Sequence, residues 1–92
     1  MSKNIPNQEK IAIVTGSSKG IGRAITITLA KSQNYSGIVT NGREIQEAQT
    51  VTKEIKELGT CESIAIEADV SIEKDCINLI EETVKIHYHR RH

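Results

Sequence analysis

Short apolar runs alternate with longer stretches of mixed polarity along the chain. The first run, Ile11–Val14, is unbroken and closes at Thr15-Gly16; a second covers residues 38–40, and a third covers residues 63–66 and leads to residues 68–70. Unbroken rather than alternating apolarity is typical of parallel strands that are buried on both faces. We therefore predict three strands at these positions.

Each apolar run is followed by a stretch in which apolar residues recur every three or four positions, the spacing of one helix face. We expect the first helix to end near Lys31-Ser32 and the second to stop at Gly59. The faces predicted to be buried are Ile21, Ala24, Ile25, Thr28 and Leu29 in the first helix, Ile45, Ala48, Val51, Ile55 and Leu58 in the second, and Ile72, Cys76, Leu79, Ile80 and Thr83 in the third.

Two polar residues mark possible helix starts. Asn41, three residues before Glu44, resembles a capping box that opens the second helix. Ser71 is a favourable N-cap for the third helix. The element order is therefore strand, helix, strand, helix, strand, helix. Strands that alternate with helices of this length predict an α/β fold with a parallel sheet and right-handed crossovers.

Composition limits the classes of protein that fit this pattern. The 92 residues allow one domain at most, and the absence of Trp and Phe leaves Ile, Val, Leu and Ala to build the core. Twelve basic residues balance twelve acidic ones, which argues against nucleic acid or an anionic membrane as the main partner. No apolar run approaches the roughly 20 residues of a membrane helix. Cys61 and Cys76 lack a C-x-x-C spacing, and we interpret them as reduced thiols of a cytoplasmic protein.

The segment that carries chemistry is the turn Thr15-Gly-Ser-Ser-Lys-Gly-Ile-Gly22, between the first strand and the first helix. Backbone N–H groups bind a phosphate only where no side chain stands in the way. Gly16 lets the chain turn sharply off the strand, Gly20 leaves room for a pyrophosphate, and Gly22 lets helix and strand pack closely. The positive end of the helix then faces the anion. The alternative is a glycine-rich turn without a ligand.

This segment resembles the cofactor signature of the short-chain dehydrogenase/reductase family, and the resemblance extends from Lys10 to Lys85 through residues 38–43 and 68–70. It implies a Rossmann-like sheet with strand order 3-2-1, incomplete relative to the family fold because the fourth strand, beside the first, is absent. Right-handed crossovers would place the first two helices on one face. The first strand would then be an open edge through which the chain could self-associate, and the third helix alone would cover the other face.

The end of the second strand predicts which cofactor is preferred. An acid is expected there to hold the adenosine ribose diol, but Gly42 occupies the position and Arg43 follows. Together with Lys19 in the glycine turn, Arg43 offers two positive partners to a ribose 2′-phosphate. We therefore expect NADP(H) to be preferred over NAD(H). The alternative is that both residues are solvated surface cations.

The resemblance also implies a role for Asp69 and Val70 at the end of the third strand. Asp69 would bond the adenine amino group and Val70 would pack nearby, whereas the alternative for Asp69 is a polar residue that merely ends the strand. The complete set of expected cofactor-binding residues is Gly16, Ser18, Lys19, Gly20, Ile21, Gly22, Arg43, Asp69 and Val70.

The family's catalytic residues have no counterpart here. Its members carry a serine and a Tyr-x-x-x-Lys pair, in which the Tyr is the general acid/base. In this chain Tyr35 has Val39 four residues on, and Tyr88 has His92, so we nominate no catalytic residue. After residue 85 the sequence departs from the family pattern, and a truncation or frameshift near codon 86 is the simplest account.

We divide the chain into a polar lead-in (residues 1–9), a partial NAD(P)-binding domain (residues 10–85) and a divergent tail rich in His and Arg (residues 86–92). The tail contains an H-x-H-x-x-H pattern, but we expect it to be unstructured and to form no metal site. Three functions stay open: part of an oxidoreductase that acts on carbonyl or alcohol substrates once the missing half is supplied, a non-catalytic nucleotide-binding module, and a truncated remnant that pairs with another chain.

Overall fold

The structure is a computed structural model that describes residues 10–91, with side chains up to residue 87. The elements follow one another as β1 (Ile11–Val14), α1 (Gly20–Ser32), β2 (Gly37–Gly42), α2 (Ile45–Leu58), β3 (Glu62–Glu67) and α3 (Glu73–Arg91). The three predicted strands are confirmed, and β2 and β3 extend beyond their apolar runs. The predicted lead-in, residues 1–9, lies outside the described residues. No helix in the described range is long and apolar enough to cross a membrane.

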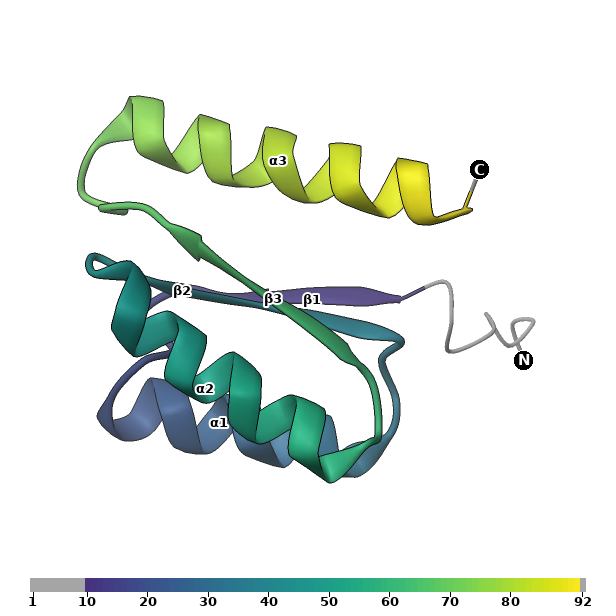
Figure 1. Cartoon of the computed structure of the whole chain (residues 1–92). Coiled ribbons are helices and arrows are strands. Elements are labelled where there is room, and N and C mark those ends of the chain that lie inside the picture. The colour runs from purple at the N-terminus through teal and green to yellow at the C-terminus, as the bar shows by residue number, and fades with distance from the viewer. Residues whose placement is uncertain (1–9, 92) are drawn as a thin grey trace, which may run out of the picture.

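The three strands form one parallel sheet in the order β1-β2-β3, which confirms the predicted order and leaves β1 at one edge. β1 pairs with β2 from Ile11 opposite Gly37, and β2 pairs with β3 from Gly37 opposite Glu62. Helices α1 and α2 lie together against one face of the sheet, and α3 lies alone against the other (Figure 1). This arrangement follows from right-handed crossovers that first run from β1 towards β3.

The central strand β2 supplies the core on both faces. All six of its residues are buried, and successive side chains point to opposite faces. Ile38 therefore packs beneath α1 and α2 with Ala30, Val51 and Ile55, whereas Val39 packs beneath α3 with Ala68 and Leu79. The cluster beneath α1 and α2 contains more large side chains, so most of the hydrophobic stabilisation lies on that face.

The buried face of α1 is not the predicted one. Thr26 and Ala30 are buried, and the predicted face is largely exposed at Ile21, Ala24, Ile25 and Thr28, with Leu29 half-buried. The cause is the close approach of α1 at Gly22, where a Cβ would lie 2.1 Å from the carbonyl oxygen of Gly16. At this separation only small residues can face the sheet. Thr26 and Ala30, which follow Gly22 at intervals of four on the same side of the helix, are such residues.

Helix α2 confirms most of its predicted face but not its predicted start. Ala48, Val51 and Ile55 are buried and Ile45 is half-buried, whereas Leu58 is exposed. The helix ends at Gly59, whose φ of +70° places it in the left-handed conformation typical of a C-cap. The predicted capping box is wrong: Glu44 is the N-cap without a side-chain hydrogen bond, and Asn41 is buried within β2.

Helix α3 begins later and ends later than the sequence predicted. It starts at Glu73, and Ser71 donates its N–H and hydroxyl to the Asp69 carboxylate, so the predicted N-cap at Ser71 is wrong. The predicted face is buried only at Leu79 and Thr83, with Cys76 half-buried and Ile72 and Ile80 exposed. The backbone is helical through Arg91, so the expectation of an unstructured tail from residue 86 is also wrong.

Candidate functional site

The predicted site residues lie at one edge of the sheet. Because the strands are parallel, the glycine turn after β1, Arg43 after β2 and Asp69 after β3 all follow the carboxyl ends of their strands. Ligands of open α/β sheets bind outside this edge. The structure therefore brings together three segments that are separated by more than 20 residues from each other in the sequence.

The three glycines of the turn occupy the environments that the sequence predicted for them. Gly16 has a φ of +61°, which turns the chain sharply off β1. Gly20 has a φ of +56°, and a Cβ at this position would meet nothing within 4 Å, so the space beside it is open. Gly22 is where α1 touches the turn. An open surface flanked by backbone is what a diphosphate group requires.

The N-terminus of α1 faces this open surface. Lys19 is the N-cap and makes no side-chain capping bond, and the first turn of α1 holds no acidic residue. The first intrahelical bond runs from the Arg23 N–H to the Lys19 carbonyl at 3.2 Å. The N–H groups of Gly20, Ile21 and Gly22 therefore have no partner within the helix, and they can donate to an anion together with the helix dipole.

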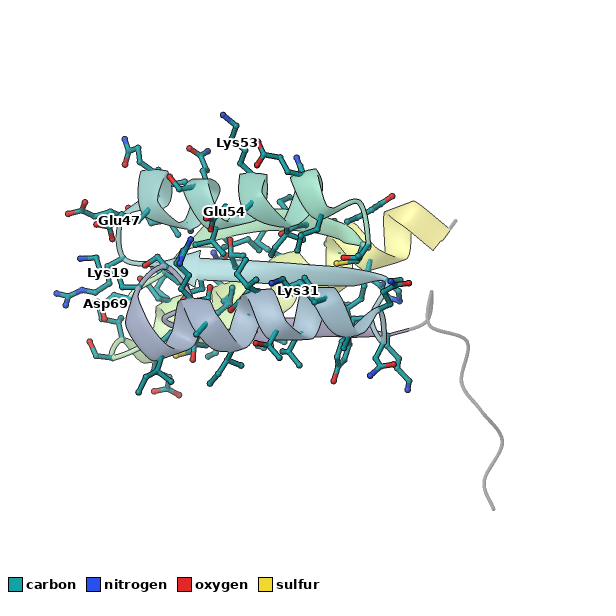
Figure 2. All side chains as sticks on the ribbon, turned by 90° about the horizontal axis from the view of Figure 1, so that it is seen from below. Lys19, Lys31, Glu47, Lys53, Glu54 and Asp69 are labelled. Atoms are coloured by element: carbon teal, nitrogen blue, oxygen red, sulfur yellow. The ribbon has the colours of Figure 1, made fainter. Side chains whose placement is uncertain are left out.

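Two exposed ion pairs border the site. Lys19 Nζ lies 3.3 Å from Glu47 Oε2, and Arg43 Nε lies 3.7 Å from Asp69 Oδ2. Figure 2 shows Lys19, Glu47 and Asp69 at the same end of the molecule, away from Lys53. Pairs this exposed contribute little to stability, so either cation can exchange its carboxylate for a phosphate at low cost.

The position expected for a ribose-binding acid is crowded. A Cβ at Gly42 would lie 3.0 Å from the Ser18 hydroxyl oxygen, so Ser18 occupies the space in which an acidic side chain would begin. Arg43, which follows, carries an exposed guanidinium. At this corner the chain offers a hydroxyl and a cation, both of which suit a phosphate.

Asp69 is held in its charged form. Hydrogen bonds from the Ser71 hydroxyl and backbone N–H, with the Arg43 charge nearby, hold the pKa of Asp69 below its ordinary value. Its own backbone N–H donates to Asp75 Oδ2 at 2.9 Å. The neighbouring Val70 is exposed, as is Ile21 on the other side of the site, so two apolar side chains are available to a ligand.

Sequence reasoning missed the residue that ties this edge together, Asn41. Its side chain is 1% exposed, accepts the Gly16 N–H at 3.1 Å, and donates to the carbonyls of Ile66 and Ala68 at 3.1 and 3.2 Å. The available signal was a polar amide directly continuing an unbroken apolar strand, because a buried amide must find partners on neighbouring segments.

A cavity lies at the other end of the strands, away from these residues. Its volume is about 650 Å³, and it opens between the start of the strands and the end of α3, where Ile11, Cys61 and His87 contribute to its walls. Burial raises the pKa of the Cys61 thiol, which disfavours the reactive thiolate. No cluster of three potential metal ligands occurs among the described residues; His89 and His92 of the predicted tail pattern lie outside the described side chains.

The sequence of the chain is similar to those of short-chain dehydrogenases. A sequence model for "short chain dehydrogenase" matches residues 10–90. The tetrahydroxynaphthalene reductase PfmaG of Pestalotiopsis fici is 39% identical over 83 residues, which are 90% of this chain and 29% of that reductase. The chain spans less than a third of the length of the curated relatives that it matches.

Two solved structures resemble the chain closely in fold. A metagenomic short-chain oxidoreductase in complex with NADP superposes with a TM-score of 0.76 at 26% identity, over 88% of this chain and 35% of its own. A 3-ketoacyl-ACP reductase from Sinorhizobium meliloti superposes with a TM-score of 0.73 at 36% identity, over 80% of this chain and 28% of its own.

Proposed function

The chain belongs to the short-chain dehydrogenase family, and we propose that it forms the NADP(H)-binding part of an oxidoreductase that acts on carbonyl or alcohol substrates. The observation that carries the proposal is the open glycine turn at the uncapped N-terminus of α1, with Asp69 and Arg43 beside it. A relative solved in complex with NADP supports the choice of ligand.

Within residues 10–85, which we assign to the nucleotide-binding domain, each segment has a part of the cofactor to hold. The glycine turn and the start of α1 bind the pyrophosphate, Lys19 and Arg43 bind the 2′-phosphate, and Asp69 with Val70 binds the adenine. Ser18 and Ile21 line the space between these groups. The bound cofactor supplies or accepts the hydride. We assign catalysis and substrate binding to sequence outside these 92 residues, because the chain contains no Tyr-x-x-x-Lys pair.

The proposal is tested by titrating the chain with NADPH and NADH and recording the quenching of intrinsic tyrosine fluorescence or the heat of binding. Saturable binding that is tighter for NADPH supports it. Binding of NADPH without turnover, even after mixing with the remaining part of a relative, would instead favour a non-catalytic nucleotide-binding module. Absence of any saturable binding to the folded chain would refute both. A cytoplasmic location stays a prediction from the sequence.

Replacing Arg43 with alanine is expected to weaken NADPH binding by about tenfold or more, since a charged hydrogen bond to phosphate is lost. NADH binding should change much less, because NADH has no 2′-phosphate. The matched control is Lys53→Ala, which removes an exposed cation of α2 away from the site (Figure 2). Equal loss of affinity for the two cofactors in Arg43→Ala would contradict the proposed NADP(H) preference.

A second function is favoured by the edge of the sheet at β1. Arg23 of α1 hydrogen bonds to Glu54 of α2. Ile25, two positions on, projects about 200° around the helix from Arg23 and therefore away from α2. Ile25 is 49% exposed and Ile21 is 80% exposed. Among residues 10–91, β1 pairs with β2 on one side only. An apolar edge strand, together with exposed isoleucines on the helix that follows it, is a surface on which a second copy of the chain can pair.

Replacing Ile25 with lysine is expected to weaken this self-association by about tenfold, because a charge would be desolvated in the contact. Sedimentation velocity over a range of concentrations measures the effect, and melting temperature should depend on concentration in the original chain. Leu58→Lys is the control, since Leu58 is an exposed hydrophobic residue at the end of α2. A monomer at all concentrations, with a sharp melt that does not move, would rule out the self-association.

A further inference from the structure

We propose that Asn41 is a positioning residue. It sets the separation between the glycine turn (residues 15–22) and the segment after β3 that contains Asp69 (residues 68–70). The inference rests on the proposed function, in which these two segments hold opposite ends of one ligand. Asn41 itself is buried in β2 and does not contact the ligand. It acts through the hydrogen bonds that join the ends of all three strands.

The side-chain amide of Asn41 uses both of its donors and its acceptor between segments. Oδ1 accepts the N–H of Gly16, the residue at which the chain leaves β1 and turns with a positive φ. Nδ2 donates to the carbonyls of Ile66 and Ala68, which lie three residues and one residue before Asp69. One planar group therefore bridges the first glycine of the turn and the end of β3.

Backbone contacts around Asn41 make the bridge stiff. The Asn41 carbonyl accepts the Ser17 N–H at 2.9 Å, and the Ser17 hydroxyl accepts the Asn41 N–H at 2.8 Å, so turn and strand are joined in both directions. Ser17 is fully buried. On the other side the Ala68 N–H donates to the Gly42 carbonyl at 3.1 Å. Neither segment can move along the sheet edge without breaking bonds to β2 or to the Asn41 amide.

A fixed separation matters most for a ligand that spans both segments. Such a ligand gains from its second contact only if that contact is already in place when the first has formed. A fragment that touches one segment gains nothing from the separation. Loss of the Asn41 bridge should therefore weaken a long ligand far more than it weakens short ones.

Asn41→Leu is the test variant, because leucine is of similar size and makes no hydrogen bonds. Thr40→Val is the matched control: Thr40 is the preceding residue of β2, is equally buried, and loses bonds to Ala48 and Thr52 of α2 rather than to the turn. Affinities are measured for NADPH, for inorganic pyrophosphate, which meets only the glycine turn, and for adenosine, which meets only the Asp69 side. If Asn41→Leu does not fold, Asn41→Ser replaces it, since the smaller polar side chain leaves room for water.

We expect Asn41→Leu to lose about tenfold in affinity for NADPH and less than about twofold for either fragment. Thr40→Val should bind all three ligands as the original chain does, despite a comparable loss of stability. A merely structural role for Asn41 would lower all three affinities in proportion to the unfolded fraction. That outcome, or unchanged NADPH affinity in Asn41→Leu, would overturn the inference.

A second measurement separates this inference from the proposed function. Amide hydrogen exchange of the ligand-free chain reports directly on the Gly16 N–H. Protection at Gly16 should be lost in Asn41→Leu and retained in Thr40→Val, and the amides around Asp69 should shift only in Asn41→Leu. If the original chain binds no NADPH, the proposed function fails. The protection of the Gly16 amide in the two variants still shows whether Asn41 holds the glycine turn in place. Unchanged Gly16 protection in Asn41→Leu would contradict the bridge itself.

Discussion

Replacing Gly22 with alanine is expected to abolish measurable NADP(H) binding and to destabilise the fold. The added Cβ would lie 2.1 Å from the Gly16 carbonyl oxygen, 3.0 Å from its carbon and 3.2 Å from the Ser17 Cα. All three are backbone atoms, so no rotation of a side chain can relieve the collision. Overpacking of this kind costs about 1–3 kcal/mol or more.

The collision cannot be absorbed by a small movement of the turn. Gly16 and Ser17 are held to β2 by hydrogen bonds with Asn41. Helix α1 must therefore move away from the sheet, and its first N–H groups move with it. Since those groups bind the pyrophosphate in the proposed function, affinity for the cofactor should fall together with stability.

Gly37→Ala provides the matched control for Gly22→Ala. A Cβ at Gly37 would lie 2.9 Å from Cδ1 of Ile11, the end of a flexible side chain that can rotate. Gly37 is the first residue of β2, whereas the site lies at the carboxyl ends of the strands. Chemical denaturation measures stability, and titration with NADPH measures affinity. If Gly22→Ala binds NADPH within about twofold of the original chain, the close approach is not needed for binding.

The sequence predicted the parts of this fold that depend on local pattern. Unbroken apolar runs located the strands, because a parallel sheet covered on both faces removes the usual alternation. Glycine spacing located the turn at the start of α1. Neither prediction required knowledge of distant residues.

Sequence predictions fail where residues that are distant in the sequence determine the burial or the hydrogen bonds of a side chain. The hydrophobic pattern predicts the wrong buried face of α1 because both sides of the helix carry apolar residues, and the contact between Gly22 and Gly16 selects the side with small ones. The local sequence at Asn41 matches a capping box and therefore predicts a helix cap, wrongly. Its actual partners, Gly16 and Ala68, are 25 and 27 residues away. Ser71 is a different case, because the competing partner is local: Asp69, two residues earlier, accepts both the backbone N–H and the hydroxyl of Ser71.

Replacing Leu79 with alanine is expected to release α3 from the sheet while the rest of the fold persists. Leu79 is 2% exposed and is the buried hydrophobic residue of α3 within the side chains that the structure describes. It packs against Val39 and Ala68. Truncation of a buried leucine costs about 2–5 kcal/mol. The neighbouring Ile77, Ile80 and Val84 are at least half exposed and cannot replace its contacts.

The release should be local because the two faces of the sheet have separate cores. The cluster formed by Ile38, Val51 and Ile55 does not include α3, so α1, α2 and the strands can remain folded. Hydrogen exchange resolved by segment should show loss of protection in α3 alone. Ile80→Ala is the control on the same helix, and its effect should stay within about 0.5 kcal/mol because the side chain is 51% exposed.

Release of α3 should also weaken cofactor binding at the proposed nucleotide site. Asp75, in the first turn of α3, accepts the Asp69 N–H, and this bond is lost when the helix detaches. Cofactor affinity should therefore fall in Leu79→Ala even though the glycine turn and α1 are intact. If protection is instead lost from all elements at once, the chain is a single cooperative unit, and the weak packing of α3 does not define a separate folding step.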